Sequence, residues 1–160
     1  MRKESEIYRR NVLNPVKFIL GMSFRLPSVV FWGIRVRQLD ENNCRVTIPF
    51  GLRTQNPFKS IYFAALGGAA ELSTGALCQM HLAGRSAHSM LVTGFRMEYV
   101  KKAATMVTFT CDQGIELQTV LDGLSSAGQT GTITMMSTGT DTAGDVVARA
   151  YITWSFRRKE

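Results

Sequence analysis

The first residues of the chain follow patterns typical of helices. Residues 4–13 can form a short helix, after which Asn14 and Pro15 restart the chain. Asn is a favoured N-cap and Pro suits the first helical position, so we predict a second short helix over residues 16–22. This segment is nearly all apolar and lacks the density of Lys and Arg typical of a membrane helix. We therefore expect it to pack on the protein's own sheet rather than to lie on lipid.

From Val30 onward the hydrophobic period changes to two. Trp32, Ile34 and Val36 fall on one face, and apolar residues alternate with polar ones again over residues 44–50. The polar cluster at residues 40–43 that separates the two runs is typical of a turn. This pattern predicts an antiparallel hairpin.

Residues 62–82 form the least ordinary segment of the chain. They are small and apolar on nearly every side, which predicts a long central helix rather than a surface helix. Gly67, Gly68 and Gly75 each lower helix propensity by up to about 1 kcal/mol relative to Ala. We expect the close approach of a sheet or a second helix to compensate for this loss.

The second half of the chain is rich in strand patterns. Alternating runs cover residues 91–99, 105–111, 130–138 and 146–156, and a helical spacing of leucines interrupts them over residues 115–126. This order predicts an α+β fold in which a curved antiparallel sheet wraps around one long helix. A doubly wound α/β sheet is disfavoured, because strands and helices do not alternate regularly. We divide the chain into an N-terminal helical extension, residues 1–29, and a main domain, residues 30–160.

Charge narrows the choice of partners without settling it. The 160 residues carry a net charge of +7. This charge favours an anionic partner, namely a phosphate, a coenzyme, a nucleic acid or a membrane surface; alternatively, the basic surface is solvated and has no partner. No nucleic-acid-binding motif is recognisable, so we expect no nucleic acid partner. No uncharged stretch is long enough to span a bilayer, and no targeting segment is visible.

The three cysteines and two histidines do not form a metal-binding pattern. Cys44, Cys78 and Cys111 are scattered and odd in number, which fits a reducing cytoplasm better than a disulfide framework. His81 and His88 alone cannot supply a His-rich zinc site. We therefore expect no metal, no cofactor and a cytoplasmic location.

Glu71 is the only charged residue between Lys59 and Arg85, and it lies in the middle of the predicted central helix. Gly67 and Gly75, one turn away on either side, leave room for another body to approach its carboxylate. An uncompensated buried carboxylate is costly or becomes protonated. Glu71 has a structural role if it reaches solvent, an Arg partner or a subunit interface. Otherwise it has a catalytic role, and the sequence leaves both possibilities open.

The start of the central helix offers a second candidate group. The first amides, over residues 62–65, have no partner within the helix and can polarise a carbonyl oxygen. Tyr62 and Glu71 are nine residues apart, about 13–14 Å along one helix. A single site would therefore need the helix start of one subunit and Glu71 of another.

The same segment resembles the hotdog-fold, acyl-CoA thioesterase-like superfamily, and is particularly similar to a bacterial branch of unknown function within it. In this superfamily a loop Asn precedes a helix that opens His-x-Gly-Ala-Leu and carries an acid about nine residues after the His. The matching residues here are Asn56, Ser60, Tyr62, Ala64, Ala65, Leu66 and Glu71. Residues 95–103 are similar to the family's third strand with its basic bend, and residues 137–156 to its closing hairpin.

The resemblance implies a homodimer with sites at the subunit interface, with pairing into a tetramer left open, and acyl-CoA or acyl-carrier thioesters as ligands. It implies that Glu71 is general base or nucleophile and that Asn56 orients the carbonyl or the attacking water. Tyr62 would be the third catalytic residue, at the helix start whose amides polarise the carbonyl. The remaining site residues would contact the substrate: Phe63, Ala64, Ala65, Gly67 and Gly75 on the helix, and Lys101 and Lys102 near the coenzyme phosphates.

Two departures from the family pattern affect the expected activity. Tyr62 replaces the family's frequent His, which disfavours a dehydratase because Tyr is a poor base at neutral pH. Ala64 replaces the Gly. We therefore expect a thioester hydrolase, with a non-catalytic acyl-binding or structural dimer as the alternative.

Overall fold

The computed structural model describes all 160 residues as a mixed α+β fold. The helices are α1 (Lys3–Leu13), α2 (Pro15–Arg25), α3 (Pro27–Phe31), α4 (Phe63–Leu82) and α5 (Gly114–Asp122). The strands are β1 (Arg35–Leu39), β2 (Cys44–Ile48), β3 (His88–Tyr99), β4 (Val107–Cys111), β5 (Thr130–Thr140) and β6 (Val146–Arg158). No helix is long and apolar enough to cross a membrane.

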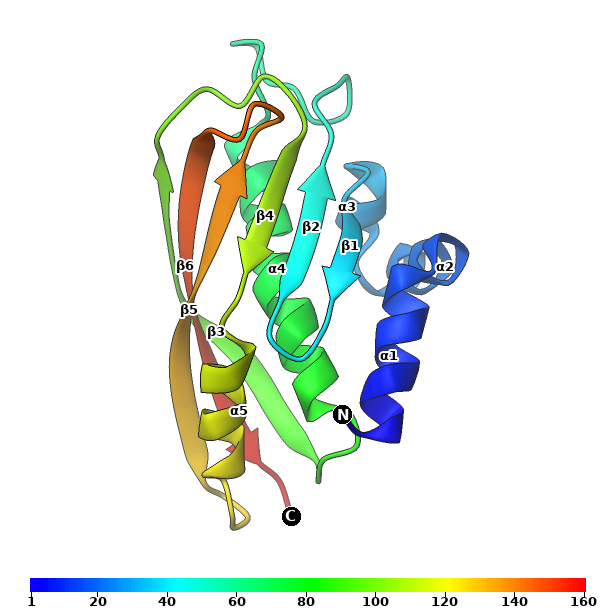
Figure 1. Cartoon of the computed structure of the whole chain (residues 1–160), viewed down its shortest axis with the longest axis vertical. Helices are drawn as coiled ribbons and strands as arrows, with labels where there is room; N and C mark the ends of the chain where they lie inside the picture. Colours follow the sequence, from blue (N-terminus) through cyan, green and yellow to red (C-terminus); the bar gives the residue numbers. More distant parts are fainter.

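A six-stranded antiparallel sheet curves around α4 in the order β1-β2-β4-β5-β6-β3 (Figure 1). The predicted sheet around a central helix is confirmed. Strands β1 and β3 form the two edges of the sheet. Helix α5 packs on α4 and β5, and α1 packs on α4 and β1, at opposite sides of the view.

Aromatic rings occupy the space that the glycines of α4 leave. A Cβ atom on Gly68 would lie 3.0 Å from the ring of Trp32, and one on Gly67 would lie 3.3 Å from the ring of Phe95 on β3. These contacts are tighter than ordinary packing, so a larger residue would displace the rings. The expected close approach to α4 is therefore made by aromatic side chains of the surrounding segments.

The N-terminal helices differ from the prediction at two places. Asn14 caps α2 as expected, since its Oδ1 accepts hydrogen bonds from the amides of Val16 and Lys17. However, α2 lies mainly against α1 and α3 rather than on the sheet as expected; its one buried residue, Phe18, meets the sheet through the guanidinium of Arg35 on β1. The strand predicted from Val30 is also wrong at its start.

Residues 27–31 instead form α3, because Pro27 starts a helical turn and Gly33, at φ +70°, ends it before β1. One hydrophobic core runs through the whole chain. It includes Val12, Phe18 and Val29 of the N-terminal helices together with the core of the sheet and of α4.

Candidate functional site

Glu71 lies in a hollow between α4 and the N-terminal helices. The hollow has a volume of about 380 Å³. Its walls come from α1, α2, α4, β3 and β6, with Leu26 joining α2 to α3, and the lining residues are Tyr8, Met22, Arg25, Leu26, Glu71, Leu72, Gly75, Ala76, Gln79, Met90 and Trp154. Most of this wall is apolar, as is typical of pockets for small molecules.

The absence of a side chain at Gly75 makes room for the carboxylate of Glu71. A Cβ atom on Gly75 would lie 3.1 Å from Oε1 of Glu71 and 3.3 Å from the ring of Trp154. Trp154 is fixed in turn, since its Nε1 donates a hydrogen bond of 2.9 Å to Oγ1 of Thr74. The glycine spacing seen in the sequence therefore places the acid beside a rigid aromatic wall.

The carboxylate of Glu71 has neither a hydrogen bond nor an ion pair. Burial raises its pKa above the ordinary value and is the only cause of that shift. Burial also raises the pKa of Tyr8, which lines the same hollow. Glu71 is thus more basic than an ordinary carboxylate, and no other group of the protein forms a hydrogen bond or ion pair with it.

Two of the four amides expected at the start of α4 are already used. The amide of Tyr62 donates to the carbonyl of Thr54 at 2.7 Å, and that of Ala65 donates to the carbonyl of Tyr62 at 3.0 Å. Only the amides of Phe63 and Ala64 remain without acceptors. These two could bind a carbonyl oxygen.

A second hollow, of about 330 Å³, lies at this end of α4. Asn56, Phe63, Lys101 and Lys102 line it together with Ser60, Ile61, Leu66, Tyr99, Val100 and Ala103. It shares no lining residue with the hollow of Glu71. The eight residues from Phe63 to Glu71 separate the two by about 12 Å within one chain.

Asn56 and Lys101 have partners within the chain. The Oδ1 of Asn56 accepts hydrogen bonds from the amide and hydroxyl of Ser60 and from the amide of Phe58, so it organises the loop before α4. The Nζ of Lys101 lies 2.8 Å from Asp141 and 2.6 Å from Asp145. Lys102 is exposed and has no ion pair, which leaves it as the free cation at this hollow.

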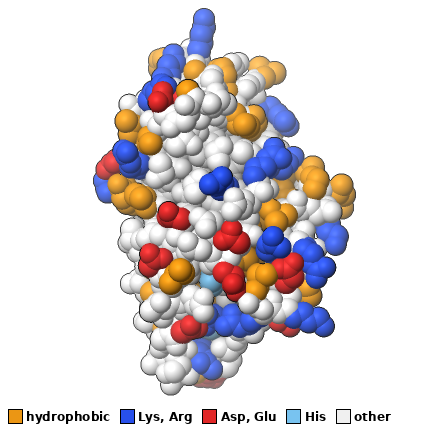
Figure 2. Space-filling model, viewed as in Figure 1, with side chains coloured by type: hydrophobic (Ala, Val, Ile, Leu, Met, Phe, Trp, Pro, Cys, Tyr) orange, Lys and Arg blue, Asp and Glu red, His pale blue; other side chains and the backbone are white.

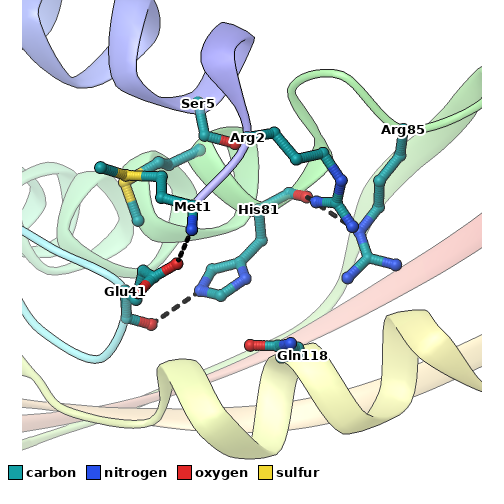
Figure 3. A pocket seen from close by; sticks show the side chains of 8 residues that line it. Met1, Arg2, Ser5, Glu41, His81, Arg85 and Gln118 are labelled. Carbon is teal, nitrogen blue, oxygen red and sulfur yellow. Dashed lines mark hydrogen bonds and ion pairs between the residues drawn. The ribbon is translucent and has the colours of Figure 1, made fainter.

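A third hollow, of about 280 Å³, surrounds His81 at the other end of α4 (Figure 3). The Nε2 of His81 donates to the carbonyl of Glu41 at 2.8 Å, and the guanidinium groups of Arg2 and Arg85 donate to the carbonyl of His81. The only buried side-chain nitrogen here without a partner is Nη2 of Arg85. These bonds tie α1 and the β1–β2 turn to the end of α4.

Sequence reasoning identified Glu71 and Gly75 but missed the wall opposite them. Tyr8, Met22 and Arg25 reach the hollow from α1 and α2, which are more than 40 residues away in the chain. The apolar pattern of residues 16–22 was a signal for burial against something, but it does not specify which surface. No three His, Cys, Asp or Glu residues lie close enough together to hold a metal ion.

A curved antiparallel sheet wrapped around one long helix is the hotdog fold. Known structures show the same fold. A Pseudomonas aeruginosa protein described as a probable thioesterase has a TM-score of 0.73 at 18% identity, with 92% of this chain and 98% of that chain covered. A thioesterase from Haemophilus influenzae has a TM-score of 0.68 at 13% identity, with 91% of each chain covered.

A Chlorobaculum tepidum protein of unknown function is similar to the same extent, with a TM-score of 0.73, 17% identity, and coverage of 92% of this chain and 99% of that chain. The chain itself belongs to the family described as Domain of unknown function (DUF4442), whose model matches residues 16–156. No curated protein sequence matches the chain.

Proposed function

We propose that the chain is an acyl thioester hydrolase in which Glu71 activates water as general base or attacks as nucleophile. The observation that carries this proposal is the partnerless carboxylate of Glu71, with its raised pKa, in a mostly apolar hollow. A general base works best when its pKa lies near the operating pH, and burial shifts Glu71 in that direction. The thioesterase-like fold fits the same role.

The hydrolysis requires two groups that one chain holds apart. The amides of Phe63 and Ala64 would polarise the thioester carbonyl, and Glu71 would take a proton from water. The water oxygen then bonds to the carbonyl carbon, the carbon–sulfur bond breaks, and the proton passes to the leaving thiolate. The products are a carboxylic acid and a free thiol.

We propose that a homodimer brings these groups together, with the helix start from one subunit and Glu71 from its partner. Strand β3 supports this arrangement because it pairs only with β6, which leaves its other edge open. Leu91, Phe95 and Tyr99 on β3 are about half exposed or more. An open edge with exposed apolar residues favours strand pairing with a second copy.

Coenzyme A or an acyl carrier protein would supply the thioester. Lys102 is the free cation beside the second hollow and would contact phosphate, whereas Lys101 would first have to leave Asp141 and Asp145. Asn56 would position the loop rather than the substrate carbonyl. The three buried free thiols fit a reducing cytoplasm as the place of action.

The test is release of free thiol from a panel of acyl-CoAs of increasing chain length. Glu71→Gln removes the basic oxygen and keeps the shape, so we expect hydrolysis to fall by about 100-fold or more. Glu116→Gln, at an exposed carboxylate on α5, is the matched control and should behave like the parent. Equal rates for Glu71→Gln and the parent would exclude the proposed role.

The alternative is a dimer that binds acyl groups without cleaving them. Tyr62 at the family's His position and the engagement of Lys101 by two aspartates favour it. This alternative predicts saturable binding of long-chain acyl-CoA with no release of thiol by the parent protein.

A further inference from the structure

An apolar stripe runs along the outer face of α2. Val16, Leu20 and Phe24 follow one another at intervals of four residues and therefore lie on one side of the helix. All three are more than half exposed, and Phe24 is 89% exposed. Phe31 of α3 adds a fourth exposed apolar side chain. We call these four residues the α2 surface; Figure 2 shows hydrophobic and basic side chains together on the side of the molecule where Figure 1 places α2.

The segment that carries the α2 surface is basic in sequence, although Arg9 and Arg10 on α1 pair with Glu6. Between Glu6 and Asp40 the chain has no acidic residue and six basic ones, namely Arg9, Arg10, Lys17, Arg25, Arg35 and Arg37. Lys17 lies on α2 next to the apolar stripe, and Arg25 follows Phe24 at the end of α2, where it lines the two neighbouring hollows. Neither forms an ion pair, and both are exposed. An exposed apolar stripe beside unpaired cations is the combination that binds an anionic lipid surface.

The α2 surface is connected with the hollow of Glu71. A hollow of about 600 Å³ lies between α1 and α2 and is lined by Leu20 and Phe24 among others. It shares Tyr8, Met22 and Arg25 with the hollow of Glu71. A chain entering from the α2 surface would therefore meet a mostly apolar wall from the outside of the molecule to the carboxylate.

We propose that the α2 surface binds the headgroup and upper acyl region of a bilayer that contains anionic phospholipid. Phe24, Leu20 and Val16 enter the bilayer interface, and Lys17 and Arg25 contact the lipid phosphates. As an extension that rests on the proposed function, the acyl tail of a membrane-associated thioester passes from the bilayer to Glu71.

A second copy of the chain fits the α2 surface less well. In a two-fold contact the same patch meets itself, so Lys17 and Arg25 would face the cations of the partner with no acid to compensate them. Like charges brought together in this way disfavour association. An anionic bilayer supplies both the apolar environment and the opposite charge.

The test is co-sedimentation of the full chain with vesicles of phosphatidylcholine alone and with vesicles that also contain phosphatidylglycerol. We expect binding to the anionic vesicles that weakens as salt is added and is much weaker with phosphatidylcholine alone. Phe24→Asp should reduce binding by about tenfold or more, because a charge replaces the exposed ring that enters the bilayer in the proposal. Lys17→Gln should reduce it about fivefold.

Leu52→Asp is the matched control, because Leu52 is 88% exposed in a loop outside the α2 surface. It should bind like the parent. Glu71→Gln should also bind vesicles like the parent, which separates failure of membrane binding from failure of hydrolysis. Absence of binding to anionic vesicles would overturn the proposal. Equal binding by Phe24→Asp and the parent would overturn it as well. If the parent does not bind vesicles and Phe24→Asp changes the oligomeric state, the α2 surface contacts a second copy instead.

Discussion

Two hollows along α4 show opposite ways of burying an ionisable side chain. His81 and Glu71 are ten residues apart on the same helix, about 15 Å. The ring of His81 donates to Glu41, and its own carbonyl accepts from Arg2 and Arg85. The carboxylate of Glu71 contacts no polar group that could satisfy it.

The difference distinguishes a polar side chain that is bonded into the fold from one that the proposed function assigns to a ligand. Buried polar groups are normally hydrogen-bonded, and the hollow of His81 follows that rule by fixing α1 against α4. The hydroxyl of Ser5 on α1 adds a bond to the carbonyl of Ala83 at the same place. The carboxylate of Glu71 is only partly buried and faces its hollow, so solvent or a ligand can reach it there.

Truncating the two side chains should produce the largest contrast. His81→Ala removes a buried ring and its hydrogen bond, so we expect a loss of about 2–3 kcal/mol in the free energy of unfolding. Glu71→Ala removes an unsatisfied carboxylate and should change stability by less than about 1 kcal/mol. Urea unfolding of the two variants and the parent measures both values. A larger loss for Glu71→Ala would mean that the acid supports the fold after all.

A smaller effect is expected when the space beside Glu71 is filled. Gly75→Ala places a methyl group against the carboxylate and the ring of Trp154, which must each yield by a few tenths of an ångström. We expect thiol release to fall about tenfold, because catalytic groups tolerate little displacement. Stability should hardly change, since Ala gains up to about 1 kcal/mol in helix propensity. Gly51→Ala is the control, because a methyl group at Gly51 would extend into open space.

The smallest effect concerns pH, and its sign differs between the two hollows. Burial lowers the pKa of His81, so acidification from its unfolded pKa of 6.5 down through the lower folded value costs stability. Burial raises the pKa of Glu71, so acidification from its raised folded pKa toward the unfolded 4.5 adds stability.

Thermal unfolding of His81→Gln and Glu71→Gln between neutral and acid pH should separate these contributions. Relative to the parent, His81→Gln should gain stability as the pH falls below about 6.5, because the variant has no buried imidazole that must stay unprotonated. The advantage of Glu71→Gln over the parent should be present at neutral pH and shrink on acidification. Parallel curves for all three proteins would contradict both shifts.

The sequence predicted the centre of the molecule better than its surroundings. The apolar run predicted as a helix over residues 62–82 forms α4 (Phe63–Leu82), and Glu71 is the one charged residue in it. These are local signals. The packing of α2 was mispredicted because an apolar pattern shows that a face prefers burial but not what covers it.

The candidate site was predicted only in part for the same reason. The Lys101–Asp141 contact spans 40 residues and depends on how the end of β3 meets the β5–β6 turn, which no single segment encodes. The use of the Tyr62 amide by Thr54 likewise depends on the folded loop. The short α3 did have a local signal in Pro27 and Gly33, which the alternating pattern that follows obscured.

The indole of Trp154 has a practical consequence. It forms a wall of the hollow beside Glu71, while Trp32, the one other tryptophan, packs over Gly68 on α4. Fluorescence emission from an indole responds to the polarity and the quenchers around it. Under the proposed function, a ligand that enters this hollow should change the emission of Trp154, and Trp154→Phe is the control that lacks this signal.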